Sequence, residues 1–81
     1  MKKIIYILLE NKSGVLSRII GLFSQRGYNI KNIKVKPFKN NKKLSTAIVE
    51  FYNNKHANNK IKKQISKLID VLNVEIIKKS I

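Results

Sequence analysis

The sequence predicts an α+β sandwich in which two helices cover one face of a four-stranded antiparallel sheet. Two observations support this prediction. Six segments follow one another in the order strand, helix, strand, strand, helix, strand, and no linker or low-complexity stretch divides the 81 residues. Two strand–helix–strand halves of this length can interlock into one sheet with both helices on the same side, the ferredoxin-like arrangement. We therefore expect residues 1–81 to form a single domain.

The first strand and the first helix are predicted within residues 1–26. Residues 4–9 form a short apolar run dominated by β-branched and aromatic side chains, which is typical of a strand with two apolar faces at the centre of a sheet. Across residues 15–26 apolar side chains recur at helical spacing. The expected buried face of this helix consists of Leu16, Ile19, Ile20 and Phe23.

Both ends of this helix have candidate capping residues. Ser13 is the expected N-cap, with Asn11 as an alternative. Gly27 suits the left-handed position just after the helix end. We expect Gly21 to allow close helix packing, and Tyr28 to be a core or interface residue.

The second and third strands are predicted over residues 28–37 and 44–52, joined by a polar hairpin loop over residues 38–43. Pro37 is expected to end the pairing of the second strand, because it has no N–H to donate. The third strand should present Ala47, Val49 and Phe51 on one face and Thr46, Ile48, Glu50 and Tyr52 on the other.

Residues 53–59 are expected to connect to a second helix that ends near Asp70, followed by a strand over residues 71–77 and a short tail. The apolar face of this helix is predicted to contain Ala57, Ile61, Ile65, Leu68 and Ile69.

The predicted fold leaves one face of the sheet bare. Apolar side chains from residues 4–9 and 44–52 should point toward that face, and a chain of 81 residues buries only about 60–65% of the surface that its unfolded form exposes. Exposed apolar sheet surface on a small domain indicates a partner. We expect a homodimer, formed either by sheet extension or by sheet packing.

The chain is strongly basic, with 18 lysine and arginine residues, four acidic residues and a formal net charge of +14. Sixteen of the basic residues are lysine, and they occur beside ten asparagines and fourteen isoleucines. Lysine, asparagine and isoleucine all have A/T-rich codons, so codon bias is the favoured explanation of the charge and a nucleic-acid surface is the alternative. Arginine is the residue that makes bidentate contacts with phosphate and guanine. Because only two are present, we expect weak attraction to polyanions and no specific nucleic acid.

The composition also indicates a compartment. The chain has no cysteine, which excludes disulfides and thiolate metal sites. Its longest apolar run is residues 4–9, whereas a membrane span needs about 20 residues. We expect a soluble cytoplasmic protein that does not contact a membrane.

The residues that usually carry catalysis are dispersed. His56 is the only histidine and lies in a polar connection, and the serines have no evident base to activate them. The three glycines form neither a P-loop nor a dinucleotide-binding motif. The four acidic residues, which are dispersed along the chain, are Glu10, Glu50, Asp70 and Glu75. Neither a metal site nor an enzymatic function is therefore predicted.

The start of the first helix offers a binding site instead. Backbone N–H groups at a helix start have no intrahelical acceptor and carry partial positive charge, so they can bind a carboxylate. Gly14 lets a ligand approach the backbone, and the amides of Asn11 and Asn29 can donate and accept, as an amino-acid zwitterion requires. The alternative is that these three residues only cap the helix or turn the chain.

Residues 11–30 resemble the signature of the acetolactate synthase (acetohydroxyacid synthase) small, regulatory subunit. The stretch Phe-Ser-Gln-Arg-Gly-Tyr-Asn-Ile at residues 23–30 is the most specific part of the match. The resemblance continues more loosely through residues 33–35, 44–45 and 64–74, and so covers essentially the whole chain.

This resemblance implies an ACT domain that dimerises and binds branched-chain amino acids, chiefly valine, at the dimer interface. By similarity, Asn11, Gly14, Val15 and Leu16 contact the effector from one chain, and Asn29 and Ile30 contact it from the neighbour. Members of the family attach to a catalytic large subunit that uses thiamine diphosphate, Mg²⁺ and FAD. They activate that subunit and make it sensitive to feedback inhibition, and they hold no cofactor themselves.

The sequence departs from the family in two respects. Many members carry a C-terminal second domain, which we do not expect in residues 1–81, and residues 46–59 differ from the usual pattern. Two other functions remain open at this point. One is a basic RNA-binding domain of the same topology, although no RNA-binding motif precedes Phe51 and Tyr52. The other is a free-standing ACT sensor that controls a different enzyme.

Overall fold

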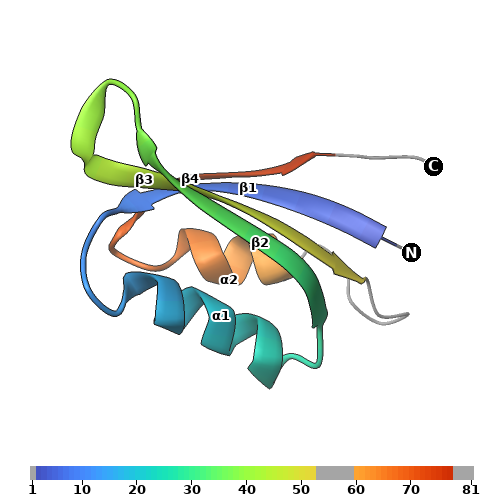
Figure 1. Ribbon diagram of the computed structural model, residues 1–81. Helices are drawn as coiled ribbons and strands as arrows, with labels where there is room; N and C mark the ends of the chain where they lie inside the picture. The colour runs from blue at the N-terminus through green and yellow to red at the C-terminus, as the bar shows by residue number, and fades with distance from the viewer. Residues whose placement is uncertain (1, 53–59, 78–81) are drawn as a thin grey trace.

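A computed structural model describes residues 2–52 and 60–77, which form a four-stranded sheet with both helices on one side (Figure 1). All strand pairs are antiparallel and the strand order is β2-β3-β1-β4. This architecture confirms the predicted fold class. The expectations for residues 53–59, which include His56 and Ala57, and for residues 78–81 lie outside the described residues. The elements are β1 (Lys2–Glu10), α1 (Val15–Gln25), β2 (Asn29–Phe38), β3 (Asn41–Tyr52), α2 (Lys60–Ser66) and β4 (Val71–Ile77).

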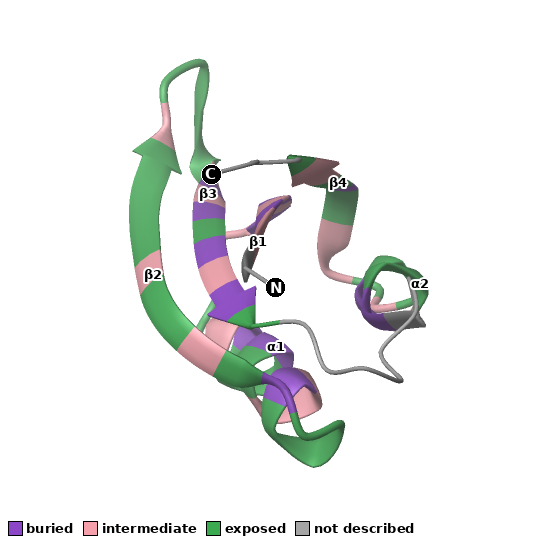
Figure 2. Cartoon of the chain, turned by 90° about the vertical axis from the view of Figure 1, so that its right-hand side faces the viewer, coloured by how far each residue is buried: buried purple, intermediate pink, exposed green. Residues whose placement is uncertain are grey.

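The core lies between the sheet and the two helices. Three aromatic rings, those of Phe23, Tyr28 and Phe51, pack edge to face with centroid distances of 5.1–5.9 Å. Along β3 the buried residues alternate with more exposed ones (Figure 2), so the predicted faces of this strand are confirmed. The other buried apolar residues are Ile5, Ile7, Leu9, Val15, Ile19, Ala47, Val49, Ile61, Ile65 and Val74.

The buried face of helix α1 differs slightly from the predicted one. Val15, Ile19 and Phe23 are buried, whereas Ile20 is 37% exposed and lies at the flank of the helix. The face is centred on residues spaced by four, which fits a helix that packs by a single stripe. At Gly21 an added Cβ would meet no atom within 4 Å, so the expected role in close packing is wrong.

The end of α1 agrees with the prediction. Gly27 has φ 76°, and the backbone N–H of Tyr28 donates to the carbonyl of Phe23 at 3.0 Å. This is the hydrogen-bond pattern of a helix that ends on a left-handed glycine. It turns the chain directly into β2.

The hairpin between β2 and β3 is tighter than predicted. Strand β2 continues through Pro37, which lies opposite Ser45, and only Lys39 and Asn40 form the turn. The expectation that Pro37 ends the pairing is wrong, because β2 is an edge strand and its outer side needs no donor.

Helix α2 is shorter than predicted. Ile61 and Ile65 are buried as expected, but the helix ends at Ser66 and Ile69 is 88% exposed. Two turns follow, in which the N–H of Leu68 donates to Ile65 and that of Val71 donates to Leu68. These turns direct Ile69 away from the core, and β4 begins at Val71 as predicted.

The second face of the sheet is covered by no described helix (Figure 1). Strand alternation places Ile4, Tyr6 and Leu8 of β1 on this open face, together with Ile48 and Tyr52 of β3. The predicted bare apolar face is therefore confirmed. Neither α1 nor α2 has the length and apolar character needed to cross a bilayer.

Candidate functional site

The start of α1 is built on Gly14 rather than on a side-chain cap. Gly14 is the N-cap residue with φ 87°, and no side chain hydrogen-bonds to the first turn within the described residues. The backbone N–H of Val15 donates to the carbonyl of Lys12 at 3.3 Å. The expectation that Ser13 or Asn11 caps this helix is therefore wrong, since the left-handed turn at Gly14 takes the place of such a cap. The next N–H groups of the helix therefore have no side-chain cap in the described residues.

The loop before α1 is held by its backbone. The N–H of Glu10 donates to the carbonyl of Asp70, and the N–H of Asn11 donates to the carbonyl of Lys43, each at 2.8 Å. Both bonds come from segments that are distant in sequence. They fix the backbone of the loop while the Asn11 side chain remains exposed.

Charges surround this loop. The Asp70 carboxylate lies 3.3 Å from the guanidinium of Arg18 and 3.7 Å from the Nζ of Lys12, which is also 3.5 Å from Glu10. The Asp70 side chain is 14% exposed, whereas the side chains of Lys12 and Arg18 are 62% and 56% exposed. Two cations therefore border the helix start, held by one largely buried acid. Sequence reasoning missed Asp70, although the scarcity of acidic residues is a signal that could have drawn attention to it.

The predicted site residues fall into two separate groups. Asn11, Gly14, Val15 and Leu16 lie at the start of α1, whereas Asn29 and Ile30 begin β2 beyond its other end. The helix has 11 residues, so roughly 16 Å separate its ends. One chain therefore does not bring the two groups together. Val15 is buried, Leu16 and Ile30 pack partly against the core, and the side chains of Asn11 and Asn29 are exposed.

Metal binding and base stacking can both be checked against the described residues. Residues 2–52 and 60–77 contain no group of three or more histidine, cysteine or acidic side chains that could hold a metal ion. Phe51 is 1% exposed and packs inside the core, so it cannot stack on a base, whereas its neighbour Tyr52 lies on the open face, as does Tyr6. Burial raises the pKa of Tyr28, while a backbone hydrogen bond with Ile61 and the charge of Arg26 oppose that rise. Tyr28 is thus a core residue, as predicted.

Several proteins are similar to this chain in sequence over most of its length. The acetolactate synthase small subunit of Buchnera aphidicola subsp. Schizaphis graminum is 51% identical over 74 residues, which cover 91% of this chain and 46% of that protein. The small subunit of acetolactate synthase isozyme 3 from Escherichia coli is 47% identical, over 91% of this chain and 45% of that protein. The chain thus spans about half the length of the curated relatives that it matches.

Solved structures share the fold. The crystal structure of the acetolactate synthase small subunit from Thermotoga maritima matches with a TM-score of 0.83 and 29% identity, over 96% of this chain and 48% of that chain. The ACT domain from the GTP pyrophosphokinase of Chlorobium tepidum matches with a TM-score of 0.75 at 22% identity, over 99% and 89% of the two chains. The latter likeness shows a common fold alone.

The family model described as "AHAS small subunit-like ACT domain" matches residues 5–73, which include most of β1, the α1 start, the Gly27 turn and all of β2 and β3. The chain therefore belongs to the family of AHAS small subunit-like ACT domains.

Proposed function

We propose that this chain is a non-catalytic regulatory subunit of a cytoplasmic acetolactate synthase. In this proposal it binds valine, or another branched-chain amino acid, between two copies of itself, and it activates and feedback-inhibits a catalytic subunit. Thiamine diphosphate, Mg²⁺ and FAD belong to that catalytic subunit. Family membership and the names of the relatives support the regulatory role. The observation that carries the binding proposal is the uncapped, glycine-initiated start of α1.

The chemistry of the helix start matches the two ends of an amino acid. Its uncapped N–H groups and the nearby cations of Lys12 and Arg18 favour a carboxylate. Gly14 is exposed and has no atom within 4 Å of an added Cβ, so a ligand can reach the backbone there. The carbonyl oxygen of the Asn11 amide can accept a hydrogen bond from the ammonium group. Since Val15 is buried and Leu16 packs partly against the core, both contribute mainly through their backbone.

The separation of the two residue groups supports a site shared between copies. Strand β2 is an edge strand that runs back toward the end of the sheet where α1 begins (Figure 1). If two copies pair their β2 strands in antiparallel fashion, Asn29 of one copy lies beside the β2 end of the other. That end of β2 lies at the same end of the sheet as Leu9, after which the chain turns through Gly14 into α1, so the pairing would bring the two groups toward each other.

Regulation then follows from linkage. An effector changes the activity of a catalytic subunit only if it binds one arrangement of the assembly more tightly than another. Valine bound between two copies stabilises their paired arrangement. The catalytic subunit senses which arrangement is populated.

Calorimetric titration of the purified chain with L-valine, with D-valine as the stereochemical control, tests the binding. We expect saturable binding of L-valine near one site per monomer or per dimer, and none of D-valine. Asn11→Ala should weaken binding, whereas Asn73→Ala, on an exposed position of β4, should not. The absence of L-valine binding both for the chain alone and for the chain mixed with an acetolactate synthase catalytic subunit contradicts the valine site.

The regulatory role has a separate test. The chain should raise the acetolactate synthase activity of the catalytic subunit when the two are mixed, and it should co-purify with that subunit. If L-valine binds but the activity of the catalytic subunit does not change, the chain is a free-standing ACT sensor of another enzyme.

A further inference from the structure

The open face of the sheet has an ordered pattern of side chains that the valine site does not use. The register sets three central rows across the strands, each containing one of the β1 residues Ile4, Tyr6 and Leu8. Read from β2 to β4, the first row contains Asn32, Glu50, Ile4 and Ile77. The middle row contains Lys34, Ile48, Tyr6 and Glu75. The third row contains Lys36, Thr46, Leu8 and Asn73. The middle row thus has a lysine at one edge, two apolar side chains in its centre and a glutamate at the other edge.

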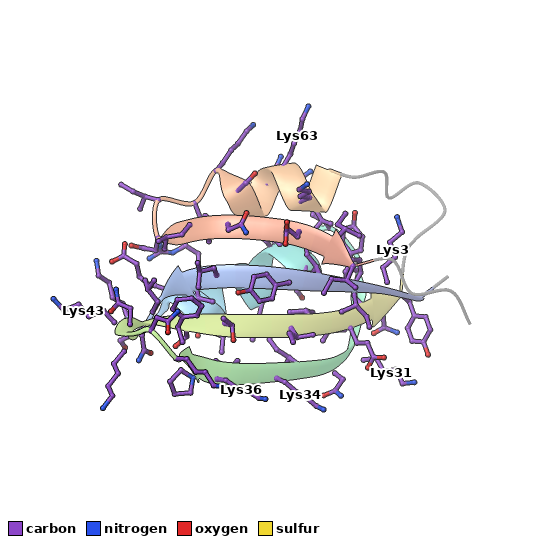
Figure 3. The ribbon with its side chains drawn as sticks, turned by 90° about the horizontal axis from the view of Figure 1, so that it is seen from above. Lys3, Lys31, Lys34, Lys36, Lys43 and Lys63 are labelled. Carbon is purple, nitrogen blue, oxygen red and sulfur yellow. The ribbon has the colours of Figure 1, made fainter. Side chains whose placement is uncertain are left out.

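These rows are electrically balanced, unlike the chain as a whole. Their charged residues are Lys34, Lys36, Glu50 and Glu75, whose formal charges cancel, whereas the chain carries +14. Figure 3 shows the two lysines along the outer strand of this face. Two copies with the same large positive charge repel each other least when such a face is between them. A polyanion gains little there for the same reason.

We propose that a second copy of the chain packs on this face, sheet against sheet. The two-fold axis runs along the strands and passes between β3 and β1. It lays β2 of one copy over β4 of the other, and β3 over β1. The middle row is then complementary to itself, because Lys34 faces the partner's Glu75 and Ile48 faces the partner's Tyr6. Packed sheets cross at about 30°, so the axis bisects the two strand directions and lies about 15° from each. The middle row is displaced least, because it lies nearest the point where the two sheets cross.

The size and character of the face fit such a contact. A stable interface buries about 800 Å² on each partner. The described chain is flat, with principal extents of 36 × 26 × 17 Å, so its broad face offers an area of that order. Ile48, Tyr52 and Ile77 are each about 40% exposed on this face, and contiguous exposed apolar residues indicate an interaction surface.

The stacking contact is compatible with pairing of β2 edges. Edge pairing uses backbone groups in the plane of the sheet, whereas stacking uses side chains perpendicular to it. Both contacts can therefore be present in one assembly of four copies. The stacking proposal does not depend on valine binding.

Charge reversal tests the proposed pair. Lys34→Glu and Glu75→Lys are both substitutions at exposed positions, and each places like charges opposite one another in the stacked arrangement. Each single variant should weaken self-association by about tenfold in sedimentation equilibrium at about 0.15 M salt, because the two-fold axis repeats the pair. The double variant should restore the association. Lys63→Glu, which makes the same charge change as Lys34→Glu but on α2, is the matched control for that variant and should leave the association nearly unchanged. The double variant keeps the wild-type net charge, so it controls for the higher charge of Glu75→Lys.

The double variant separates stacking from edge pairing. Residue 75 lies on β4, at the opposite edge of the sheet from β2, so β2 pairing cannot sense it. The proposal is overturned if the wild-type chain is monomeric, if Lys34→Glu behaves like Lys63→Glu, if Glu75→Lys associates like the wild type, or if the double variant does not recover.

Cross-linking gives an independent measurement, because the chain has no cysteine of its own. An equimolar mixture of Ile48→Cys and Tyr6→Cys chains, treated with a short bis-maleimide, should give at least fivefold more cross-linked dimer than a mixture of Ile48→Cys and Lys63→Cys chains. Equal yields in the two mixtures contradict the stacked arrangement.

Discussion

The Asp70 carboxylate accepts a hydrogen bond from the Arg18 guanidinium at 3.3 Å, across 52 residues of sequence. The same residue receives the backbone N–H of Glu10 on its carbonyl oxygen and lies 3.7 Å from the Nζ of Lys12. Asp70 thus connects the turn before β4 with both sides of the proposed effector loop. We therefore expect Asp70 to position that loop.

Replacement of Asp70 by asparagine should therefore affect both stability and valine binding. The Asp70→Asn variant keeps the shape of the side chain but loses its charge, and we expect a loss of about 1 kcal/mol of unfolding free energy because the cations are largely exposed. The loss should shrink as salt screens the wild-type pairs. Urea unfolding at low and high salt measures it.

The control for Asp70→Asn is Glu75→Gln, an equivalent loss of charge at an exposed position of β4. It should leave L-valine affinity unchanged, whereas Asp70→Asn should change it several-fold, since the loop loses one of its anchors. A variant at residue 70 that binds L-valine like the wild type contradicts the positioning role.

Gly14→Ala should destabilise the chain without any steric clash. An added Cβ meets no atom within 4 Å, so the cost comes from φ 87°, a left-handed conformation that non-glycine residues adopt at a penalty of about 1 kcal/mol. Thermal unfolding should show a lower Tm for this variant. L-valine affinity should also fall, because the methyl group stands where the ligand approaches the backbone. An unchanged affinity in a folded Gly14→Ala protein places the ligand elsewhere.

Much of the fold could be predicted from the sequence because the signals are local. Ile19 and Phe23 follow helical spacing, and Gly27 marks a left-handed helix end that depends only on its neighbours. The errors concern features that tertiary structure decides. Ile69 has the spacing of a helix residue but lies beyond the last turn of α2, and Pro37 stays paired because β2 is at the sheet edge.

In the candidate site, too, the local features could be predicted from the sequence and the tertiary contacts could not. The position of Gly14 before a helix could be predicted from its neighbours, but the anchors of the loop could not. Asp70 and Lys43 are far from the loop in sequence, and only the fold brings them to it. The likeness of residues 11–30 to a family pointed to Asn29, which physical reasoning alone left as an alternative. The structure adds that Asn29 and the helix start lie at opposite ends of α1 within one chain.

Gly21→Ala should raise the free energy of unfolding, whereas Gly14→Ala should lower it. Gly21 lies inside α1, its φ is not left-handed, and an added methyl group meets no atom within 4 Å. Glycine in a helix interior costs roughly 0.5–1 kcal/mol relative to alanine, so the variant should be more stable by about that amount. Urea unfolding of the two alanine variants side by side gives the comparison. A loss of stability for Gly21→Ala shows that the glycine has a packing role after all.

Tyr28→Phe should change how stability depends on pH. Burial raises the pKa of Tyr28 in the folded chain above its ordinary value of 10.0. Below pH 10 the phenol is neutral in both folded and unfolded chains, so its full contribution is present. As pH rises through 10 and toward the folded pKa, only the unfolded chain releases the proton, and this contribution is lost.

At pH 7 we therefore expect Tyr28→Phe to cost about 1 kcal/mol, because the hydrogen bond with the backbone of Ile61 disappears. Above pH 10 the difference between wild type and variant should shrink, since the phenylalanine has no proton to lose. Comparing the two proteins at each pH removes the common effect of the lysines, which titrate in the same range. Urea unfolding from pH 7 to 11 measures both curves. A difference that stays constant, or grows, above pH 10 contradicts a raised pKa at Tyr28.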